Sequence, residues 1–236
     1  MIDLSRAFVK TLRATWLWQS SPALLIVAFI SLNPKSSSNE ICIVAGGLSA
    51  RMGRDKSRMR LQGKTLLQHV QNNAFALGWP VKVIRRDLVP RCGPMGGVYT
   101  ALKTSQARSV LFMACDMPFV SGAFLQLLAA QPDSAAEAIF VEVDGRVGFP
   151  FLLLRSALAQ IEKQLASRQF SIEDLCKTCR GRRVVAPPDQ SWMFLNINNP
   201  QDWQLARKIA RKIARGKPLD TVIECFCIRH PSRTSD

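Results

Sequence analysis

The stretch Ile41-Cys42-Ile43-Val44-Ala45-Gly46-Gly47-Leu48-Ser49-Ala50-Arg51-Met52-Gly53-Arg54-Asp55-Lys56 decides how the rest of the sequence is interpreted. It begins as a short apolar run with β-branched residues, which is typical of a buried strand. The run ends at two glycines, where the backbone can adopt positive φ and approach a ligand closely. Basic residues follow, and backbone N–H groups beside Arg and Lys bind anions well. The stretch predicts a nucleotide phosphate site from Gly46 to Lys56; the alternative is a surface turn before a basic helix.

The glycine spacing excludes two common phosphate-binding motifs. A P-loop requires Gly, four residues and then Gly-Lys-Ser/Thr. Here five residues separate Gly47 from Gly53, and Arg54 follows. The Gly-x-Gly-x-x-Gly pattern of dinucleotide-binding proteins is absent as well. Any phosphate site in this loop is therefore of another kind.

Length and charge describe one large domain with anionic partners. The chain has 236 residues, of which 47% are hydrophobic, and a formal net charge of +15. This charge suits phosphates, nucleotides, nucleic acid or an anionic membrane surface. The densest basic block, 207–217, lacks the interleaved aromatic residues of a stacking platform. We interpret it as the solvated face of a helix and expect no nucleic acid partner; a basic interaction surface is the alternative.

Seven cysteines are scattered through the chain. An odd number in apolar segments favours reduced thiols and a cytoplasmic protein over a disulfide framework. Cys176-x-x-Cys179 together with Cys225-x-Cys227 could form a four-thiolate zinc site, although the second pair lacks the usual two-residue gap. Ordinary thiols are the preferred interpretation.

The two ends of the chain differ from its body. Cationic residues precede an apolar stretch at 23–32, and a Pro- and Ser-containing linker follows, as in a signal peptide. The stretch is too short to span a bilayer, and no cleavage site is evident. We therefore expect an N-terminal extension and linker at 1–38, one domain at 39–216, a C-terminal tail at 217–236, and no integral membrane association.

Apolar segments of strand and helix type alternate along the body, which predicts an α/β fold. The expected architecture is a three-layer, Rossmann-like arrangement of a mostly parallel sheet with helices on both faces. Pro150 indicates that its strand is an edge strand or contains a bulge. Strands are expected at 40–45, 81–84, 110–115, 138–143, 147–154, 182–185 and 192–198, and helices at 65–77, 97–104, 121–130, 155–166, 171–179 and 199–215.

Asp116 directly follows the strand at 110–115, which has no polar interruption. A strand that is apolar on both faces belongs in the middle of a covered sheet. Ligands of open α/β sheets bind at the carboxyl ends of the strands. Asp116 is therefore a candidate site residue, and its alternative role is to cap the helix at 121–130.

Four segments in order carry a resemblance to a known family. The loop up to Lys56 resembles the signature of nucleotidyltransferases, and three further segments strengthen the match: Gly93-Pro94-Met95-Gly96-Gly97, Cys115-Asp116-Met117-Pro118-Phe119 and Phe194-Leu195-Asn196-Ile197-Asn198-Asn199-Pro200. Over about residues 40–210 the chain resembles molybdenum cofactor guanylyltransferase. The cytidylyltransferase for the same cofactor shares the first loop.

This resemblance implies GMP transfer from GTP to molybdopterin by a monomer, with Mg2+ as cofactor and release of pyrophosphate. Backbone of Val44, Ala45 and Gly46 would contact the nucleotide. Arg51 and Lys56 would neutralise the triphosphate, and Asp116 would hold Mg2+ and contribute to catalysis. The remaining candidates, for contacts to the substrate, are Gly97, Asn196 and Asn198, and the resemblance also implies that Asn198 is a polar metal ligand.

One segment departs from the family pattern. Family members carry a further strand and helix where this chain has only residues 79–91. The family's asparagine in that region has no counterpart, and its aspartate falls at Arg86 or Asp87. Because these positions help to hold the nucleoside, two alternatives stay open: a cytidylyltransferase, and an inactive nucleotide-binding relative.

Overall fold

The computed structural model describes residues 38–46, 59–89, 91–130 and 137–216. The predicted N-terminal extension (apart from Ser38) and the C-terminal tail lie outside these residues. Most of the signature loop, 47–58, lies outside them too.

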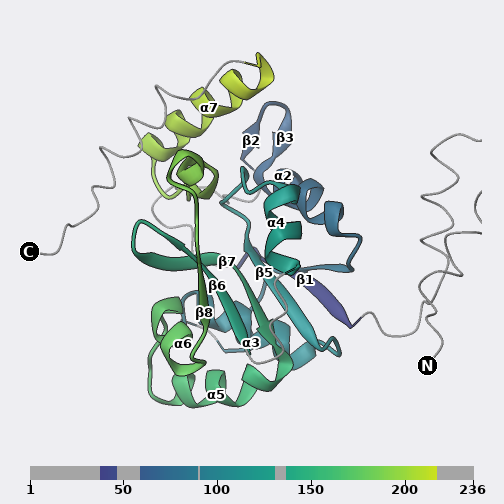
Figure 1. Ribbon diagram of the computed structural model, residues 1–236, viewed down its shortest axis with the longest axis vertical. Helices are drawn as coiled ribbons and strands as arrows, with labels where there is room; N and C mark the ends of the chain where they lie inside the picture. The colour runs from purple at the N-terminus through teal and green to yellow at the C-terminus, as the bar shows by residue number, and fades with distance from the viewer. Residues whose placement is uncertain (1–37, 47–58, 90, 131–136, 217–236) are drawn as a thin grey trace, which may run out of the picture. The chain divides into compact units, whose positions relative to one another are not determined.

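A six-stranded sheet forms the centre of the domain (Figure 1). Five strands run in one direction and β7 runs against its two neighbours, so the predicted mostly parallel sheet is confirmed. In spatial order the strands are β4 (Val81–Ile84), β1 (Asn39–Val44), β5 (Ser109–Ala114), β7 (Arg146–Leu154), β6 (Ala138–Val143) and β8 (Arg182–Val185).

Helices cover both faces of the sheet, as predicted. Alternate residues of β1 enter the two cores: Ile41 and Ile43 face one, and Cys42 and Val44 face the other. The first core is closed by α2 (Leu66–Ala74) and α4 (Gly122–Ala129), the second by α3 (Pro94–Thr104), α5 (Leu158–Ala166) and α6 (Ile172–Thr178). The short 3-10 segments Phe75–Leu77 (η2) and Arg155–Ala157 (η3) extend α2 and precede α5.

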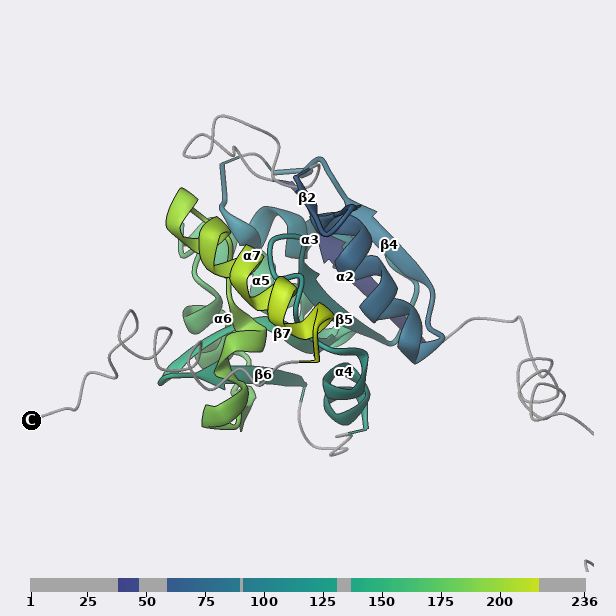
Figure 2. The ribbon, with the colours of Figure 1, turned by 90° about the horizontal axis from the view of Figure 1, so that it is seen from above.

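The last helix, α7 (Pro200–Ala214), builds a third, smaller core with the hairpin of β2 (Arg60–Leu61) and β3 (Lys64–Thr65). Figures 1 and 2 both show α7 beside this hairpin. Its buried stripe includes Leu205 and Ile209, and its outer face carries the exposed Arg207, Lys208 and Arg211. The basic block is thus the outer face of an amphipathic helix. Among the described residues no helix has the length and hydrophobicity to cross a membrane.

The shortened segment 79–91 still completes the sheet. Strand β4 pairs in parallel with β1 from Ile41↔Val81 to Val44↔Ile84. The carboxyl ends of the two strands are therefore level, and the loop after β4 emerges beside the loop after β1. Although the family's further strand and helix are missing here, β4 occupies the edge of the sheet next to β1.

Two predictions about strands need correction. β7 is an interior strand, so Pro150 does not mark an edge; the predicted bulge is confirmed instead, because the register passes from Phe140↔Phe151 to Val141↔Gly148. The segment 192–198 is not a strand. Pro188–Phe194 forms a 3-10 helix (η4), and its Met193 and Phe194 pack into the core on the α4 side. An apolar run without strict alternation cannot be distinguished from a buried helical turn by periodicity.

The start of α3 also differs from the prediction of 97–104. The helix begins at Pro94, so Gly-Pro-Met-Gly-Gly forms its cap and first turn. Proline suits the first helical position because its missing N–H would have no helical partner there. Gly96 and Gly97, which suggested a loop, are helical and buried, whereas Gly93 is the exposed N-cap.

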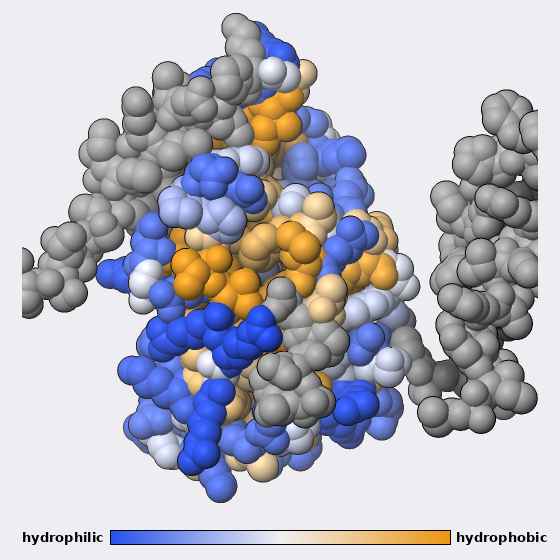
Figure 3. All heavy atoms as spheres, viewed as in Figure 1, coloured by the Kyte–Doolittle hydropathy of each residue, from blue (hydrophilic) through white to orange (hydrophobic). Residues whose placement is uncertain are grey.

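The surface of the domain carries both apolar and hydrophilic side chains. Figure 3 shows apolar side chains gathered below α7, over the β6–β7 hairpin, with hydrophilic side chains around them. The exposed large apolar residues include Val185 on the edge strand β8.

Candidate active site

Three strand ends meet at one edge of the sheet and position the candidate residues. The N–H of Ala45 donates to the carbonyl oxygen of Ile84 at 2.8 Å, and the N–H of Cys115 donates to that of Val44 at 3.1 Å. The end of β1 is therefore bonded to the ends of both neighbours, β4 and β5. This is the edge at which α/β sheets bind ligands. The predicted nucleotide contacts Val44, Ala45 and Gly46 lie there.

The first turn of α3 packs closely against this edge. A Cβ atom on Gly97 would lie 2.6 Å from Cγ1 of Val44, and one on Gly96 would lie 2.8 Å from the carbonyl oxygen of Val89. Both glycines therefore have a steric reason to lack a side chain. Their backbone brings the N-terminus of α3, which has no side-chain cap, next to the end of β1. Gly97 is thus near Val44, as its proposed role requires.

Asp87, three residues after β4, points its carboxylate at this edge. Its Oδ1 lies 3.2 Å from the Cβ position of Gly46, and its Oδ2 lies 2.8 Å from that of Gly96. Oδ1 is buried and has no hydrogen-bond partner among the residues that the structure describes. Burial raises the pKa of this carboxyl above its usual range. A buried acceptor without a donor is costly, so the position is suited to a ligand that brings N–H or O–H groups.

The sequence alone left Arg86 and Asp87 as equal candidates for this position. In the structure Arg86 is exposed, whereas Asp87 is half-buried against Gly46 and Gly96. What separates them is the path of the loop over α3, which no local sequence pattern encodes.

Asp116 lies on the other side of β1, at the end of β5. It is half-buried, and its backbone oxygen accepts a hydrogen bond from the N–H of Ile197 at 3.0 Å. The helix-cap alternative for Asp116 is wrong, because Ser121 caps α4 by accepting from the N–H of Phe124. Asp116 therefore does not cap α4, and it lies at the sheet edge.

The bond to Ile197 brings Asn196 and Asn198 alongside Asp116. Asn196 is exposed, and Asn198 is half-buried. The N–H of Asn198 donates to Oδ2 of Asp202 at 2.8 Å, within the capping box that starts α7. The path of this segment is thus fixed from both ends. The structure brings together all the candidates except Arg51 and Lys56, which lie outside the described residues.

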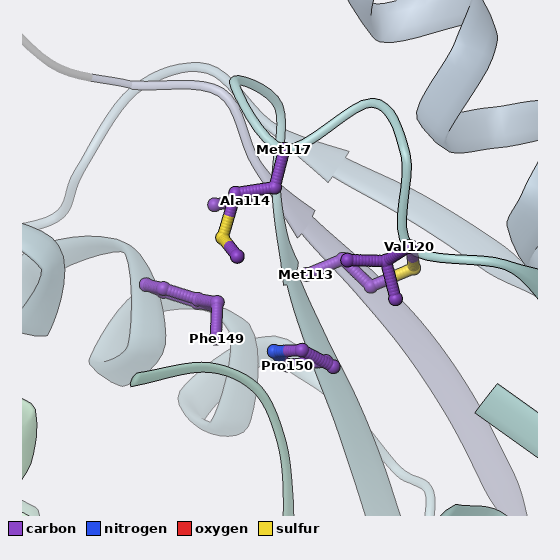
Figure 4. Close-up of a pocket in the computed structure, with 6 residues that line it drawn as sticks. All are labelled: Met113, Ala114, Met117, Val120, Phe149 and Pro150. Carbon is purple, nitrogen blue, oxygen red and sulfur yellow. The ribbon is translucent and has the colours of Figure 1, made fainter. Parts of the chain in front are cut away.

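A small apolar pocket lies on the α4 side of the sheet, and its residues Ala114 and Met117 flank Asp116 in the sequence (Figure 4). Its lining consists of Met113, Ala114, Met117, Val120, Phe149 and Pro150. Such a lining offers no donor or acceptor side chain to a phosphate. The polar chemistry of the site therefore belongs to the edge between Asp87 and Asp116.

The residues at this edge fit a hard divalent cation better than zinc. The Asp116 carboxylate and the Asn198 side chain offer oxygen ligands, which Mg2+ prefers in combination with substrate phosphates. Cys42, Cys176 and Cys179 are free thiols, and burial raises the pKa of Cys42 to about 12 and that of Cys179 to about 11. Within the described residues no cluster of three or more His, Cys, Asp or Glu forms a metal site. Cys225 and Cys227 lie outside them.

The fold and this edge define a nucleotidyltransferase, and comparison with known proteins identifies its family. The family model described as the MobA-like NTP transferase domain matches residues 41–184. A protein named "Probable molybdenum cofactor guanylyltransferase" from Opitutus terrae is 31% identical, over 70% of this chain and 93% of its own. The molybdenum cofactor guanylyltransferase of Shewanella frigidimarina is also 31% identical, over 72% and 96%. The chain therefore belongs to the MobA-like NTP transferases, on the molybdenum cofactor guanylyltransferase branch, which confirms the resemblance.

Solved structures agree on the fold. Molybdopterin-guanine dinucleotide biosynthesis protein A from Archaeoglobus fulgidus matches with a TM-score of 0.59 at 21% identity, over 73% of this chain and 99% of that one. At this identity the match supports the architecture alone. It agrees with the layered α/β sheet predicted from the sequence.

Proposed function

We propose that this protein transfers GMP from GTP to molybdopterin and releases pyrophosphate. The observation that carries the proposal is the arrangement at the sheet edge, where the end of β1 lies between the loop of Asp87 and the end of β5 at Asp116. One side offers a buried acceptor for a nucleoside, and the other offers a ligand for a metal on the phosphates. The named relatives in the same family support the choice of substrates.

On the nucleoside side, the carboxylate of Asp87 recognises guanine by accepting hydrogen bonds from the base. The guanine edge presents two adjacent donors, N1–H and the 2-amino group, which match the two oxygens of a carboxylate. Cytosine presents a donor beside an acceptor, which a carboxylate cannot satisfy. The unpartnered, buried Oδ1 of Asp87 next to Gly46 supports this role, because it gains its missing donor only when the base is bound. The backbone of Val44, Ala45 and Gly46 lines the same nucleotide.

On the phosphate side, Asp116 holds Mg2+, which neutralises the charge that develops on the triphosphate. Arg51 and Lys56 add positive charge from the signature loop. Gly97, Asn196 and Asn198 contact the second substrate. Their placement beside Val44 and Asp116 supports this assignment.

The reaction requires no nucleophilic side chain. An oxygen of the terminal phosphate of molybdopterin forms a bond to the α-phosphorus of GTP, and the bond from this phosphorus to the bridging oxygen of the β-phosphate breaks. The electron pair leaves with pyrophosphate. Positioning and charge neutralisation supply most of the catalysis in such phosphoryl chemistry, and the rigid edge between β4 and β5 provides the positioning.

The test incubates purified protein with molybdopterin, Mg2+ and labelled GTP or CTP in parallel. We expect a guanine dinucleotide product with GTP and little product with CTP. Product with CTP alone would indicate the cytidylyltransferase. Binding of GTP without product from either nucleotide would indicate the inactive relative.

We also propose that the enzyme is a cytoplasmic monomer. The free, buried thiols of Cys42, Cys176 and Cys179 support a reducing compartment. Sedimentation of the purified protein would test the oligomeric state directly.

A further inference from the structure

We infer that Thr100 is a positioning residue. Its hydroxyl fixes the loop that carries Asp87 and thereby sets the selectivity of the enzyme for guanine. This inference rests on the proposed function, because it assigns a residue to the nucleoside side of that site. Thr100 lies in the second turn of α3 and is only 6% exposed. Nothing in the sequence motifs points to it.

Thr100 joins the loop to the first turn of the helix through one oxygen atom. Its Oγ1 accepts a hydrogen bond from the N–H of Leu88 at 2.8 Å and donates one to the carbonyl oxygen of Gly96 at 2.7 Å. Leu88 directly follows Asp87. Gly96 is the residue over which the Asp87 carboxylate lies. The hydroxyl therefore connects both neighbours of this carboxylate.

The loop has little else to hold it at this point. The side chain of Leu88 is 58% exposed, so packing does not fix its position. The carboxylate of Asp87 has a buried oxygen without a donor, so it contributes no hydrogen bond from that atom to hold the loop. Val89 packs against the core on the α3 side and limits the loop further along. The hydrogen bond between the Thr100 hydroxyl and the N–H of Leu88 thus aligns Asp87 before a ligand binds.

The matched pair of variants is Thr100→Val and Thr104→Val. Valine keeps the shape of threonine and removes the hydroxyl. Thr104 lies one turn further along α3, and its Oγ1 donates within the helix, to the carbonyl oxygen of Thr100 at 2.8 Å. Both variants lose a bond within the helix, but only Thr100→Val releases the N–H of Leu88. Thr100→Ser keeps the hydroxyl and serves as the rescue variant.

The experiment measures the Kd of GTP and of CTP by calorimetry, together with thermal unfolding. We expect Thr100→Val to weaken GTP binding about 10-fold, the size of one lost hydrogen bond with an orphaned partner. CTP binding should change little, Thr104→Val should leave the ratio of the two Kd values unchanged, and Thr100→Ser should restore it. In an Asp87→Ala background the effect of Thr100→Val on GTP should vanish, because the two residues act as a unit.

Two results would overturn the inference. Folded Thr100→Val protein with wild-type affinity for GTP would show that the hydroxyl does not position the site. Equal losses for GTP and CTP in Thr100→Val and Thr104→Val would show a general effect on α3. Failure of the wild-type protein to bind GTP at all would instead contradict the proposed function, on which the inference rests.

Discussion

Two aspartates flank the end of β1, and they differ in how the fold holds them. Asp116 ends a strand in the interior of the sheet, and its backbone is bonded to Ile197. Asp87 lies in the loop after the edge strand β4, and its carboxylate has a buried oxygen without a partner. The first is placed by the sheet itself, whereas the second depends on a loop and on the helix beneath it. The difference agrees with the roles proposed for them: a metal ligand needs a fixed position, whereas a side chain that recognises the base gains its hydrogen-bond donors with the substrate.

The largest effect is expected from removing the carboxylate on the phosphate side. Asp116→Asn should lower kcat/KM for dinucleotide formation by at least about 100-fold, because the metal loses a charged ligand. GTP binding measured without Mg2+ should change little. A steady-state assay over a range of Mg2+ concentrations checks this. Near-normal turnover in folded Asp116→Asn protein would remove Asp116 from the metal site.

A smaller effect is expected from crowding the wall that the two sides share. Gly97→Ala would place a methyl group 2.6 Å from Val44, so either α3 or the end of β1 must move. We expect a loss of about 1–3 kcal/mol in the free energy of unfolding, as in overpacked cores.

The control for that variant is Gly148→Ala in β7, where an added Cβ meets nothing within 4 Å. Urea denaturation of both variants measures the difference. Equal stability of the two would show that α3 and β1 are not packed as tightly as the structure indicates.

The sequence predicted the metal side of this comparison better than the nucleoside side. Asp116 follows a strand with an unbroken apolar pattern, so both the strand end and the carboxylate were visible. Asp87 follows a four-residue strand and a turn, and which of two neighbours faces inward depends on the path of the loop over α3. That path is set by contacts 12 residues apart in sequence, such as the bond from Leu88 to Thr100, and no local pattern encodes it.

The same distinction holds for the fold. Strands and helices with clear periodicity, such as β1, β5 and α7, were predicted within one or two residues. One error fell at 192–198, where an apolar run without strict alternation fits both a strand and a buried helical turn. Another fell at the start of α3, where proline and glycine fit both a loop and a helical turn. In both places packing against the core decided the outcome.

The smallest effect is expected in the pH dependence of GTP affinity, which depends on the protonation of the Asp87 carboxyl. Burial raises the pKa of the free carboxyl, and only the ionised form can accept from both donors of guanine. GTP affinity should therefore be highest above this raised pKa and fall as the pH decreases through it, by up to about 10-fold per pH unit. Calorimetry of wild-type and Asp87→Asn protein over the same pH range separates this effect from the titration of GTP itself. An identical pH dependence in the two proteins would contradict the assignment.

The most direct test of the proposed role of Asp87 changes two hydrogen-bonding patterns together, that of the side chain at position 87 and that of the base. Xanthosine triphosphate replaces the 2-amino group of guanine with an oxygen, so it presents a donor beside an acceptor. An asparagine amide matches that pattern, and a carboxylate does not. Product formation should therefore favour GTP in the wild-type enzyme and xanthosine triphosphate in Asp87→Asn. Loss of GTP activity in Asp87→Asn without any gain for xanthosine triphosphate would contradict the claim that Asp87 reads the base.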